Sequence, residues 1–498
     1  MRLLSVLYLV FHSTILLSQI GFNRTYDQNG GAEVGKVILA NDSSFLVAAS
    51  ILDSSFSVSI LLERMDLFGG VLKSMVLRKD SHDLRLLGLK SLIQTQDGNY
   101  LISGGIENRA TSTRRGLLIK FSQELDTIWL KTYQLGSHMV EFGPILELPN
   151  GDIVTTGYYV SSINTNPEIL FSKFSSTGEI KWFQTLGTSN SEVGFSLSPT
   201  FDGGFYIGAQ VERTSSFDKD PYLLKIDSTG AVEWDTIFGG SMADGPAIVT
   251  TTLTGKSLVA THFADSTSGN ITFYGKPWIL EFNELGEVVW QKKYGRNLRG
   301  EPSAIQQHLD STISIVGNYQ DGNPSESIVG WVAKTTQNGE MLWEVQFVPN
   351  PGSADNGNSY LRGLALISNK SIAVCGFTQP STGQDLWVAK LDSNGCYDPN
   401  RNCWVSTEEY TEIPEGTFKM WPNPAKDRVW ISLPEQPMAG TLRFFSITGQ
   451  QLREESISKS DPREVGLTIQ DWAPGMYLVR WEPLEGPTME GKILVETR

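Results

Sequence analysis

The chain has 498 residues, 40% of them hydrophobic, and carries a formal net charge of −15. Because nucleic-acid phosphates attract basic surfaces, a charge of this sign argues against nucleic acid as a partner. Its 48 glycines, 13 tryptophans and 3 cysteines agree with an exported, all-β chain, and its length leaves room for more than one domain.

The first 18 residues predict a secretory signal peptide. Arg2 supplies the positive charge, and residues 3–17 form a mostly apolar run that is short and very close to the start. We expect cleavage near Ser18; an N-terminal anchor or a buried strand is the alternative. No later apolar run approaches the ~20 residues that a membrane helix needs, so the mature chain is expected to have no transmembrane segment.

A ten-residue frame recurs along the chain. In its clearest copy, Lys225 to Trp234 reads Lys-Ile-Asp-Ser-Thr-Gly-Ala-Val-Glu-Trp, which predicts a strand, a glycine turn and the start of a second strand. A second strand pair lies between successive frames, so each repeat predicts four strands. Repeats of roughly 40–50 residues are typical of propeller blades. The first positions of the frames, 52 to 56 residues apart, are Arg64, Lys120, Lys173, Lys225, Glu281, Lys334 and Lys390.

These seven repeats predict a seven-bladed β-propeller over residues 19–404. The last repeat has three strands only, and the segment from Gln19 to Tyr26 fits the missing outer strand, with Phe22 at the usual tryptophan position. We therefore expect the N-terminal strand to close the last blade, which protects two exposed sheet edges. Pairing of residues 20–26 with the first blade's own strands would contradict this expectation.

A large apolar residue stands three positions before each anchor and is expected to pack between neighbouring sheets. An aromatic row of this kind can also stack sugars, so a ligand role is the alternative. The residues are Leu61, Leu117, Leu170, Tyr222, Trp278, Trp331 and Trp387.

Long connections are expected to gather on one face of the ring and tight turns on the other. Function concentrates on variable loops held by a rigid frame, so the long connections supply the candidate ligand contacts. For each residue, ordinary solvent exposure is the alternative. The candidates are Arg114, Arg115, Asp218, Asp220, Tyr274, Asp355 and Asn356.

No catalytic, cofactor or metal motif is evident in the sequence. The histidines show no zinc-binding spacing, and neither a nucleophile elbow nor a phosphate-binding glycine loop is present. Carboxylates could still meet across the central channel, as in glycosidases. Residues 355–359 are rich in oxygen ligands and could bind Ca²⁺, although a polar loop is the favoured interpretation.

The repeat frame resembles that of quinoprotein-like propellers and of repeat propellers in Bacteroidetes-type surface proteins. The quinoprotein resemblance would imply a quinone site with Ca²⁺ ligands and often two adjacent cysteines, and no such cysteine pair is present. We expect no cofactor.

Cys396 and Cys403 are expected to form a disulfide at the end of the ring, whereas Cys375 is expected to be buried in a strand.

Residues 405–417 read as an acidic, proline-containing linker, and the repeat frame is absent beyond them. Four short strands then predict a small antiparallel, Ig-like β-sandwich over residues 418–498. They are expected at residues 429–433, 441–446, 476–481 and 492–496.

The tail resembles the type A C-terminal sorting domains of type IX secretion. Trp421, Pro422, Asn423 and Pro424 resemble the opening Tyr-Pro-Asn-Pro signature, with tryptophan in place of tyrosine. Three later landmarks follow in order, at Gly449, at Gly475 with Tyr477, and at residues 492–495. An unrelated Ig-like module is the alternative. The resemblance implies an outer-membrane translocon and a sorting peptidase as partners, cleavage within the linker, and release or surface attachment of the cargo.

These observations favour an exported, non-catalytic binding or scaffold protein whose ring takes an extracellular glycan or protein ligand. A secreted hydrolase or lyase with its site at the channel mouth is the alternative from a different class, and a purely structural surface role is the third. Converging carboxylates or a metal in the channel would favour catalysis.

Overall fold

The computed structural model describes residues 21–495 apart from several short segments, and it divides the chain into two compact units, Met1–Glu408 and Glu409–Arg498. In the described residues all regular structure is β-strand. The segments outside the description are 28–31, 53–56, 88–89, 137, 164, 214–217, 269–271, 296–298, 321–326, 350–356, 368–369, 382, 398–418, 422–424, 434–438, 447–450, 459–463, 473–474 and 484–488. The predicted signal peptide and linker therefore lie outside the described residues.

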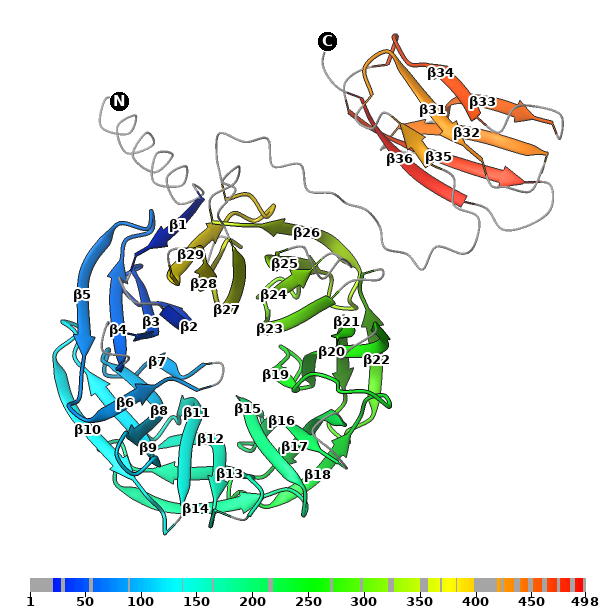
Figure 1. Cartoon of the computed structure of the whole chain (residues 1–498). Coiled ribbons are helices and arrows are strands. Elements are labelled where there is room, and N and C mark those ends of the chain that lie inside the picture. Colours follow the sequence, from blue (N-terminus) through cyan, green and yellow to red (C-terminus); the bar gives the residue numbers. More distant parts are fainter. Residues whose placement is uncertain are drawn as a thin grey trace, which may run out of the picture. The chain divides into compact units, whose positions relative to one another are not determined.

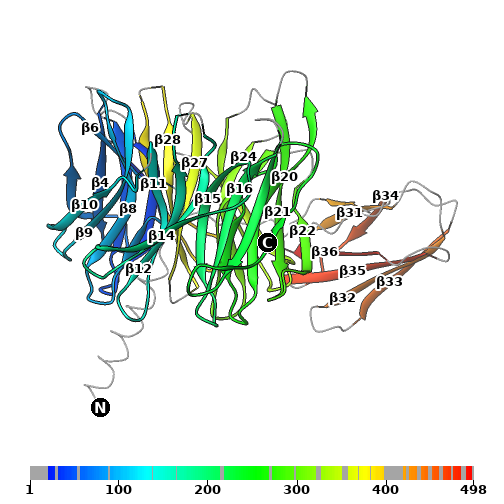
Figure 2. The ribbon, with the colours of Figure 1, turned by 90° about the horizontal axis from the view of Figure 1, so that it is seen from below.

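The described strands of the first unit form five four-stranded sheets and one nine-stranded sheet, arranged around a ring (Figure 1). The strands run side by side through the thickness of the ring (Figure 2). Three of the sheets are β2 (Ala32–Leu39), β3 (Phe45–Leu52), β4 (Val58–Met65) and β5 (Val71–Leu77); β15 (Ser191–Pro199), β16 (Phe205–Glu212), β17 (Lys219–Ile226) and β18 (Val232–Ile237); and β19 (Ile248–Thr251), β20 (Ser257–Ser268), β21 (Thr272–Phe282) and β22 (Val288–Lys293).

The nine-stranded sheet is two consecutive repeats joined by one parallel pairing, between Met139 and Arg114. Its strands are β6 (His82–Arg85), β7 (Leu92–Gln94), β8 (Tyr100–Asn108), β9 (Thr113–Phe121) and β10 (Thr127–Tyr133), then β11 (Met139–Glu147), β12 (Ile153–Val160), β13 (Glu168–Phe174) and β14 (Ile180–Leu186). The remaining two sheets are β23 (Arg299–Gln307), β24 (Ile313–Gln320), β25 (Val329–Thr335) and β26 (Met341–Phe347), and β27 (Asn358–Leu366), β28 (Ile372–Gln379), β29 (Asp385–Leu391) and β1 (Phe22–Tyr26).

The first strand of the chain completes the last sheet. β1 pairs antiparallel with β29, Phe22 opposite Lys390 and Tyr26 opposite Leu386. The Tyr26 hydroxyl also donates to the Gly69 carbonyl of the first sheet, at 2.6 Å. This pairing agrees with the closure that the sequence predicts, and it joins the two ends of the ring without leaving β29 as an exposed edge.

The glycine and the aromatic residue of the repeat frame meet across neighbouring sheets. Gly286 has φ +81, and a Cβ there would lie 3.0 Å from the Trp234 ring of the preceding sheet. Gly69 meets Phe22 of the last sheet in the same way. A turn with positive φ favours glycine, and the neighbouring ring leaves little room for a side chain, so these copies of the frame favour glycine. Leu125 takes the same position in one copy, with φ 60.

Ion pairs explain the charged anchor of the frame. In five repeats the anchor side chain pairs with a residue in the turn between the first two strands of its own repeat. The fifth repeat carries the same pair with the two signs exchanged, which shows that the pair, rather than either charge, is what recurs. The pairs are Arg64–Asp42, Lys120–Asp97, Lys173–Asp152, Lys225–Asp202 and Glu281–Lys256.

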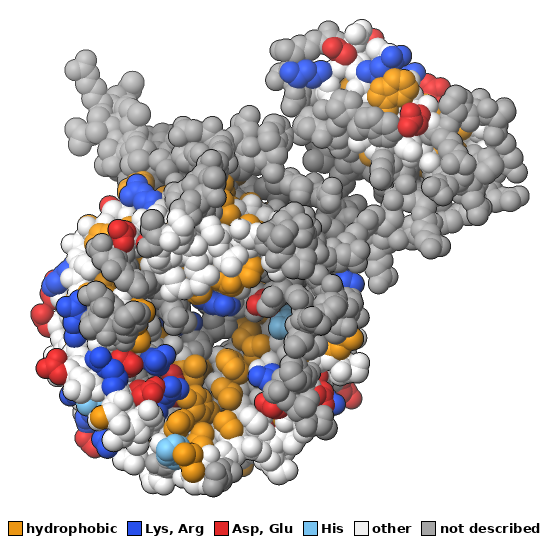
Figure 3. All heavy atoms as spheres, in the orientation of Figure 1, with side chains coloured by type: hydrophobic (Ala, Val, Ile, Leu, Met, Phe, Trp, Pro, Cys, Tyr) orange, Lys and Arg blue, Asp and Glu red, His pale blue; other side chains and the backbone are white. Residues whose placement is uncertain are grey.

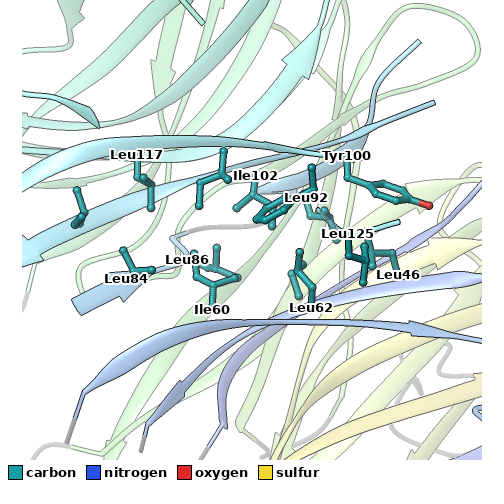
Figure 4. Packing of buried hydrophobic residues seen from close by; sticks show 14 of the residues in the cluster. Leu46, Ile60, Leu62, Leu84, Leu86, Leu92, Tyr100, Ile102, Leu117 and Leu125 are labelled. Atoms are coloured by element: carbon teal, nitrogen blue, oxygen red, sulfur yellow. The ribbon is translucent and has the colours of Figure 1, made fainter. Parts of the chain in front are cut away.

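The core of the ring lies between neighbouring sheets. Figure 4 shows Ile60 and Leu62 of β4 facing Leu84 and Leu117 of the next repeat. The apolar residue before each anchor is buried in every repeat, which confirms the predicted packing role. The residues are Leu61, Leu117, Leu170, Tyr222, Trp278, Trp331 and Trp387.

The second unit contains two described sheets around its own apolar core, which includes Phe444, Trp481 and Ile493. Among the described residues, no helix is long and apolar enough to cross a membrane. The strands are β30 (Lys419–Trp421), β31 (Arg428–Ser432) and β34 (Glu464–Thr468) in one sheet, and β33 (Gln451–Ile457), β32 (Gly440–Ser446), β35 (Gly475–Pro483) and β36 (Met489–Val495) in the other.

Candidate functional site

A cavity of about 350 Å³ lies inside the ring, lined by residues from the innermost part of all seven repeats. Apolar side chains such as Leu92, Ile145 and Ile248 form most of its wall. Figure 3 shows hydrophobic atoms along the central hollow and Lys or Arg atoms within it. The cationic side chains that line the cavity are Lys36, Lys90 and Arg362.

The two lysines of the cavity are held in a poorly solvated environment. Lys36 lies in β2 with 4% of its surface exposed, and burial, together with the charge of Arg362, lowers its pKa to about 7. Lys90 as a whole is half-buried. Burial is the only cause that lowers its pKa, to about 8. Neither ammonium group forms an ion pair with another residue that the structure describes. Both groups are therefore poised to change charge near neutral pH.

Arg362 reaches the cavity through a β-bulge. Leu361 is opposite Gly376 and Gly363 is opposite Cys375, so Arg362 is the extra residue of β27. A bulge re-aims the side chain that it inserts, and bulges are common beside functional sites. Burial lowers the pKa of Arg362, while the charge of Glu301 opposes that shift.

The lining of the cavity contains no Asp or Glu among the described residues. Apart from the three cations, its polar members are Ser196 and Gln306. The Gln306 Oε1 atom is buried and accepts no hydrogen bond from a described group. The described wall therefore lacks the paired carboxylates that acid–base hydrolysis needs, and instead combines positive charge with apolar surface.

Arg114, a predicted ligand contact, is occupied within the protein. Its guanidinium lies 2.6 Å from Glu107 Oε2 and 2.7 Å from Glu141 Oε2, and it donates to the Tyr158 hydroxyl. Tyr158 in turn donates to Glu141 at 2.8 Å. This network ties β8 and β9 to β11 and β12, so Arg114 acts as a link between two repeats. Arg115 is exposed.

Asp220 lies in a buried carboxyl pair with Asp244. A Cβ on Gly239 would meet Asp220 Oδ1 at 2.0 Å and Asp244 Oδ2 at 2.5 Å, which places both carboxyls beside that glycine. Burial raises the pKa of Asp220 to about 6, the Arg213 guanidinium 2.6 Å away opposes the shift, and the Asp244 and Asp218 charges add to it. Burial also raises the pKa of Asp244.

The pair is nevertheless enclosed. Asp220 has no exposed surface, and Asp244 accepts backbone hydrogen bonds from Gly240 and Ala264 at 2.6 Å each. Asp218 is half-buried, and its carbonyl accepts a hydrogen bond from the Arg213 backbone.

The prediction that the ligand candidates lie in loops is wrong for four of them. Arg114 and Arg115 lie in β9, Asp220 in β17 and Tyr274 in β21. The strands of these hairpins extend further than their sequences suggest, because backbone pairing continues into polar segments. Asp355 and Asn356, with the proposed Ca²⁺ loop, lie outside the described residues, as does Cys403. In the described part, no group of three or more potential metal ligands occurs.

Sequence reasoning missed the three cavity cations. The signal was present: in the innermost strands, most repeats place apolar residues or serine where Lys36 and Arg362 stand. A departure of this kind from an internal repeat is visible in a single sequence, but its meaning depends on knowing which strand is innermost.

In the tail, Tyr477 is buried in β35 and packs against Trp472, with ring centroids 4.6 Å apart. Gly475 begins β35 and Trp421 ends β30. Pro422, Asn423, Pro424 and Gly449 lie outside the described residues.

The fold and the tail define an exported, all-β protein with a propeller-like ring. Residues 419–496 match the family model of the secretion system C-terminal sorting domain. The resemblance to type IX sorting domains is thereby confirmed, and the tail implies interaction with the type IX machinery. The protein is therefore secreted or displayed at the cell surface.

Solved structures with a similar shape have diverse titles. The surface component PorZ of the type IX system of Porphyromonas gingivalis matches with TM-score 0.33 and 10% identity over 93% of this chain, which spans 51% of PorZ. Puromycin hydrolase matches with TM-score 0.49 and 11% identity, covering 82% of this chain and 59% of its own. A protein of unknown function from Dyadobacter fermentans matches with TM-score 0.44 and 12% identity, and the match covers 75% of this chain and 98% of that protein. At this identity none defines a function for the ring. No curated protein matches the chain.

Proposed function

We propose that the protein is an exported binding protein, a seven-bladed β-propeller over residues 19–404 that carries an Ig-like sorting sandwich at 418–498. A signal peptide over residues 1–18 directs inner-membrane export, and the sorting tail engages the type IX translocon. A sorting peptidase then cleaves within residues 405–417, and a disulfide between Cys396 and Cys403 holds the end of the ring. The ring binds its extracellular ligand in the central cavity.

The observation that carries the proposal is the composition of the cavity. Its apolar wall and three cationic side chains provide contact surface and charge for a ligand, and its described lining offers no carboxylate to act as a general acid or base. A concave, mostly apolar site with a few convergent polar groups is the usual form of a small-molecule binding site.

Two experiments test the two halves of this function. In a bacterium with type IX secretion, deletion of residues 418–498 should retain the protein inside the cell envelope, whereas the full chain reaches the exterior. The purified chain without residues 1–18 should bind a subset of glycans on an array. Unchanged delivery of the truncated chain would contradict the export route, and absence of any bound glycan or protein ligand would contradict the binding role.

A secreted hydrolase is the second candidate, and the Asp220–Asp244 pair is the observation that favours it. A carboxyl with a pKa raised to about 6 suits a general acid near neutral pH. A screen of chromogenic glycosides would decide: turnover that disappears in Asp220→Asn would establish catalysis. We rank this candidate second because Asp220 has no exposed surface through which a substrate could reach it.

A further inference from the structure

We propose that the central cavity binds a small hydroxylated anion, such as a sugar acid or a sugar carrying a phosphate or sulfate group, through Lys36, Lys90 and Arg362. This inference rests on the proposed binding function and names the chemistry of its ligand. The anionic group would lie among the three cationic side chains, and the body of the ligand would lie against the apolar wall.

Convergence of three cations from distant parts of the chain is the first argument. Lys36 comes from β2, Lys90 from the segment before β7 and Arg362 from β27, and all three line one cavity. No described Asp or Glu joins them there. Like charges brought together away from water repel one another. The charge of Glu301 acts on Arg362, but no described carboxylate pairs with Lys36 or Lys90, so the arrangement favours an anion as a further partner.

A contrast within the ring strengthens this argument. Three of the repeat lysines have described carboxylate partners, as Lys120 has in Asp97 at 2.6 Å and Lys225 has in Asp202 at 2.7 Å. Lys36 and Lys90 have no such partner among the described residues. Carboxylates therefore neutralise four basic anchors of the scaffold, whereas the cavity lysines lack such a partner among the described residues; the four anchors are Arg64, Lys120, Lys173 and Lys225.

The electrostatic state of the lysines agrees with a site for an anion. Burial lowers the pKa of Lys36 to about 7 and that of Lys90 to about 8, which reduces the positive charge held in the cavity. A bound anion favours the protonated ammonium form, so binding would be accompanied by proton uptake.

The size and polarity of the cavity restrict the class of ligand that fits it. A volume of about 350 Å³ lies near the lower end of the range of small-molecule pockets, roughly 300–1,000 Å³, so one sugar-sized molecule fits. Gln306 and Ser196 are the uncharged polar residues of the lining, available for hydrogen bonds to ligand hydroxyls. Ile145, Ile248 and Leu364 supply an apolar surface for the ring of a sugar.

Isothermal titration of the chain without residues 1–18 tests the proposal. Sodium glucuronate, glucose 6-phosphate and glucose 6-sulfate distinguish the three possible anionic groups, inorganic phosphate tests the charge alone, and glucose is the neutral analogue. At least one anionic sugar should bind about 100-fold more tightly than glucose, because hydrogen bonds to charged groups are the stronger ones. The affinity should also fall as salt is added.

Substitutions locate the site. Lys36→Met and Lys90→Met should each weaken binding about tenfold or more, while Lys79→Met, at an exposed lysine, should not change it. If Lys36→Met fails to fold, Lys90→Met alone decides. Equal binding by these variants and the wild type would overturn the site, and binding of glucose as tight as that of the anions, or no anion binding at about 10 mM, would overturn the ligand class. A neutral ligand found on the array would leave the proposed binding function intact.

Discussion

The ring contains two sets of cationic side chains that differ in their partners. Four basic anchors of the repeat, Lys225 among them, pair with a carboxylate in the turn between the first two strands of their repeat, and their spacing recurs along the chain. Lys36 and Lys90 line the cavity with no described counter-ion. Recurring charged pairs thus belong to the scaffold, whereas the cavity lysines are the positions at which we propose that ligand binding outweighs local stability.

The largest effect should come from breaking the scaffold at its closure. Phe22 is 7% exposed and packs on Gly69 of the first sheet, so Phe22→Ala should lower the free energy of unfolding by about 3–5 kcal/mol, as for other buried aromatic residues. Urea denaturation followed by tryptophan fluorescence measures this loss. Phe201→Ala, at a phenylalanine with 75% of its surface exposed, is the matched control and should cost less than about 1 kcal/mol.

The cavity lysine should behave in the opposite sense. Removal of its buried charge should stabilise the ligand-free protein, so Lys36→Met should raise the free energy of unfolding at pH 7 by up to about 4 kcal/mol. Chemical denaturation measures it. Destabilisation of the ligand-free protein by this change would show that Lys36 serves the scaffold.

The pH dependence of Lys36 gives a separate test. Its folded pKa of about 7 lies below the unfolded value of 10.5, so the unfolded chain binds more protons between these values and stability rises with pH. Arg362 and Lys90 in the cavity and Cys375 on β28 are the charged or titratable groups beside it. Burial raises the pKa of Cys375 from 9.0 to about 12, so its thiol lowers stability as pH rises towards 9. Both proteins retain Cys375, so comparison with Lys36→Met between pH 7 and 9 removes its contribution. The wild type should gain stability over this range relative to Lys36→Met.

A smaller effect should come from the turn glycine of the repeat. Gly286→Ala introduces both strain at φ +81 and a methyl group 3.0 Å from Trp234. Gly203→Ala, at φ +88 with no atom within 4 Å, introduces strain alone. Thermal denaturation should show both variants destabilised, with Gly286→Ala worse by about 1 kcal/mol. Equal losses would mean that the glycine is needed for its backbone conformation only.

The smallest effect should come from the paired anchor. Lys225→Met removes ion pairs with Asp202 and Glu233, both at 2.7 Å. Asp202 and Glu233 are partly exposed, so solvent screening limits the loss to about 1 kcal/mol, opposite in sign to the change at Lys36. Denaturation at low and at high salt checks it, because a pair of this kind weakens as salt is added.

The scaffold was predictable because the same strand-and-turn pattern recurs in several repeats of the sequence. The frame around Lys225 predicted the strands and the turn, and the position of Phe22 predicted the pairing of β1 with β29. The cavity was not predictable, since Lys36 and Arg362 are more than 300 residues apart and meet only when the ring forms. The sequence around Arg114 is polar, and for that reason it was predicted to be a loop. In the structure Arg114 lies in β9 and forms an ion pair with Glu141.

Because β1 pairs with β29, the ring can close only when the last repeat has been made. The earliest-made strand has its partner near residue 390, so it stays unsatisfied until all seven repeats exist. A product that stops short of β27 to β29 would leave an unpaired strand and an open edge, which are features that promote aggregation and degradation. β1 can therefore pair only in a chain that includes β29, and a secretion pathway that handles folded cargo would receive molecules with a complete ring.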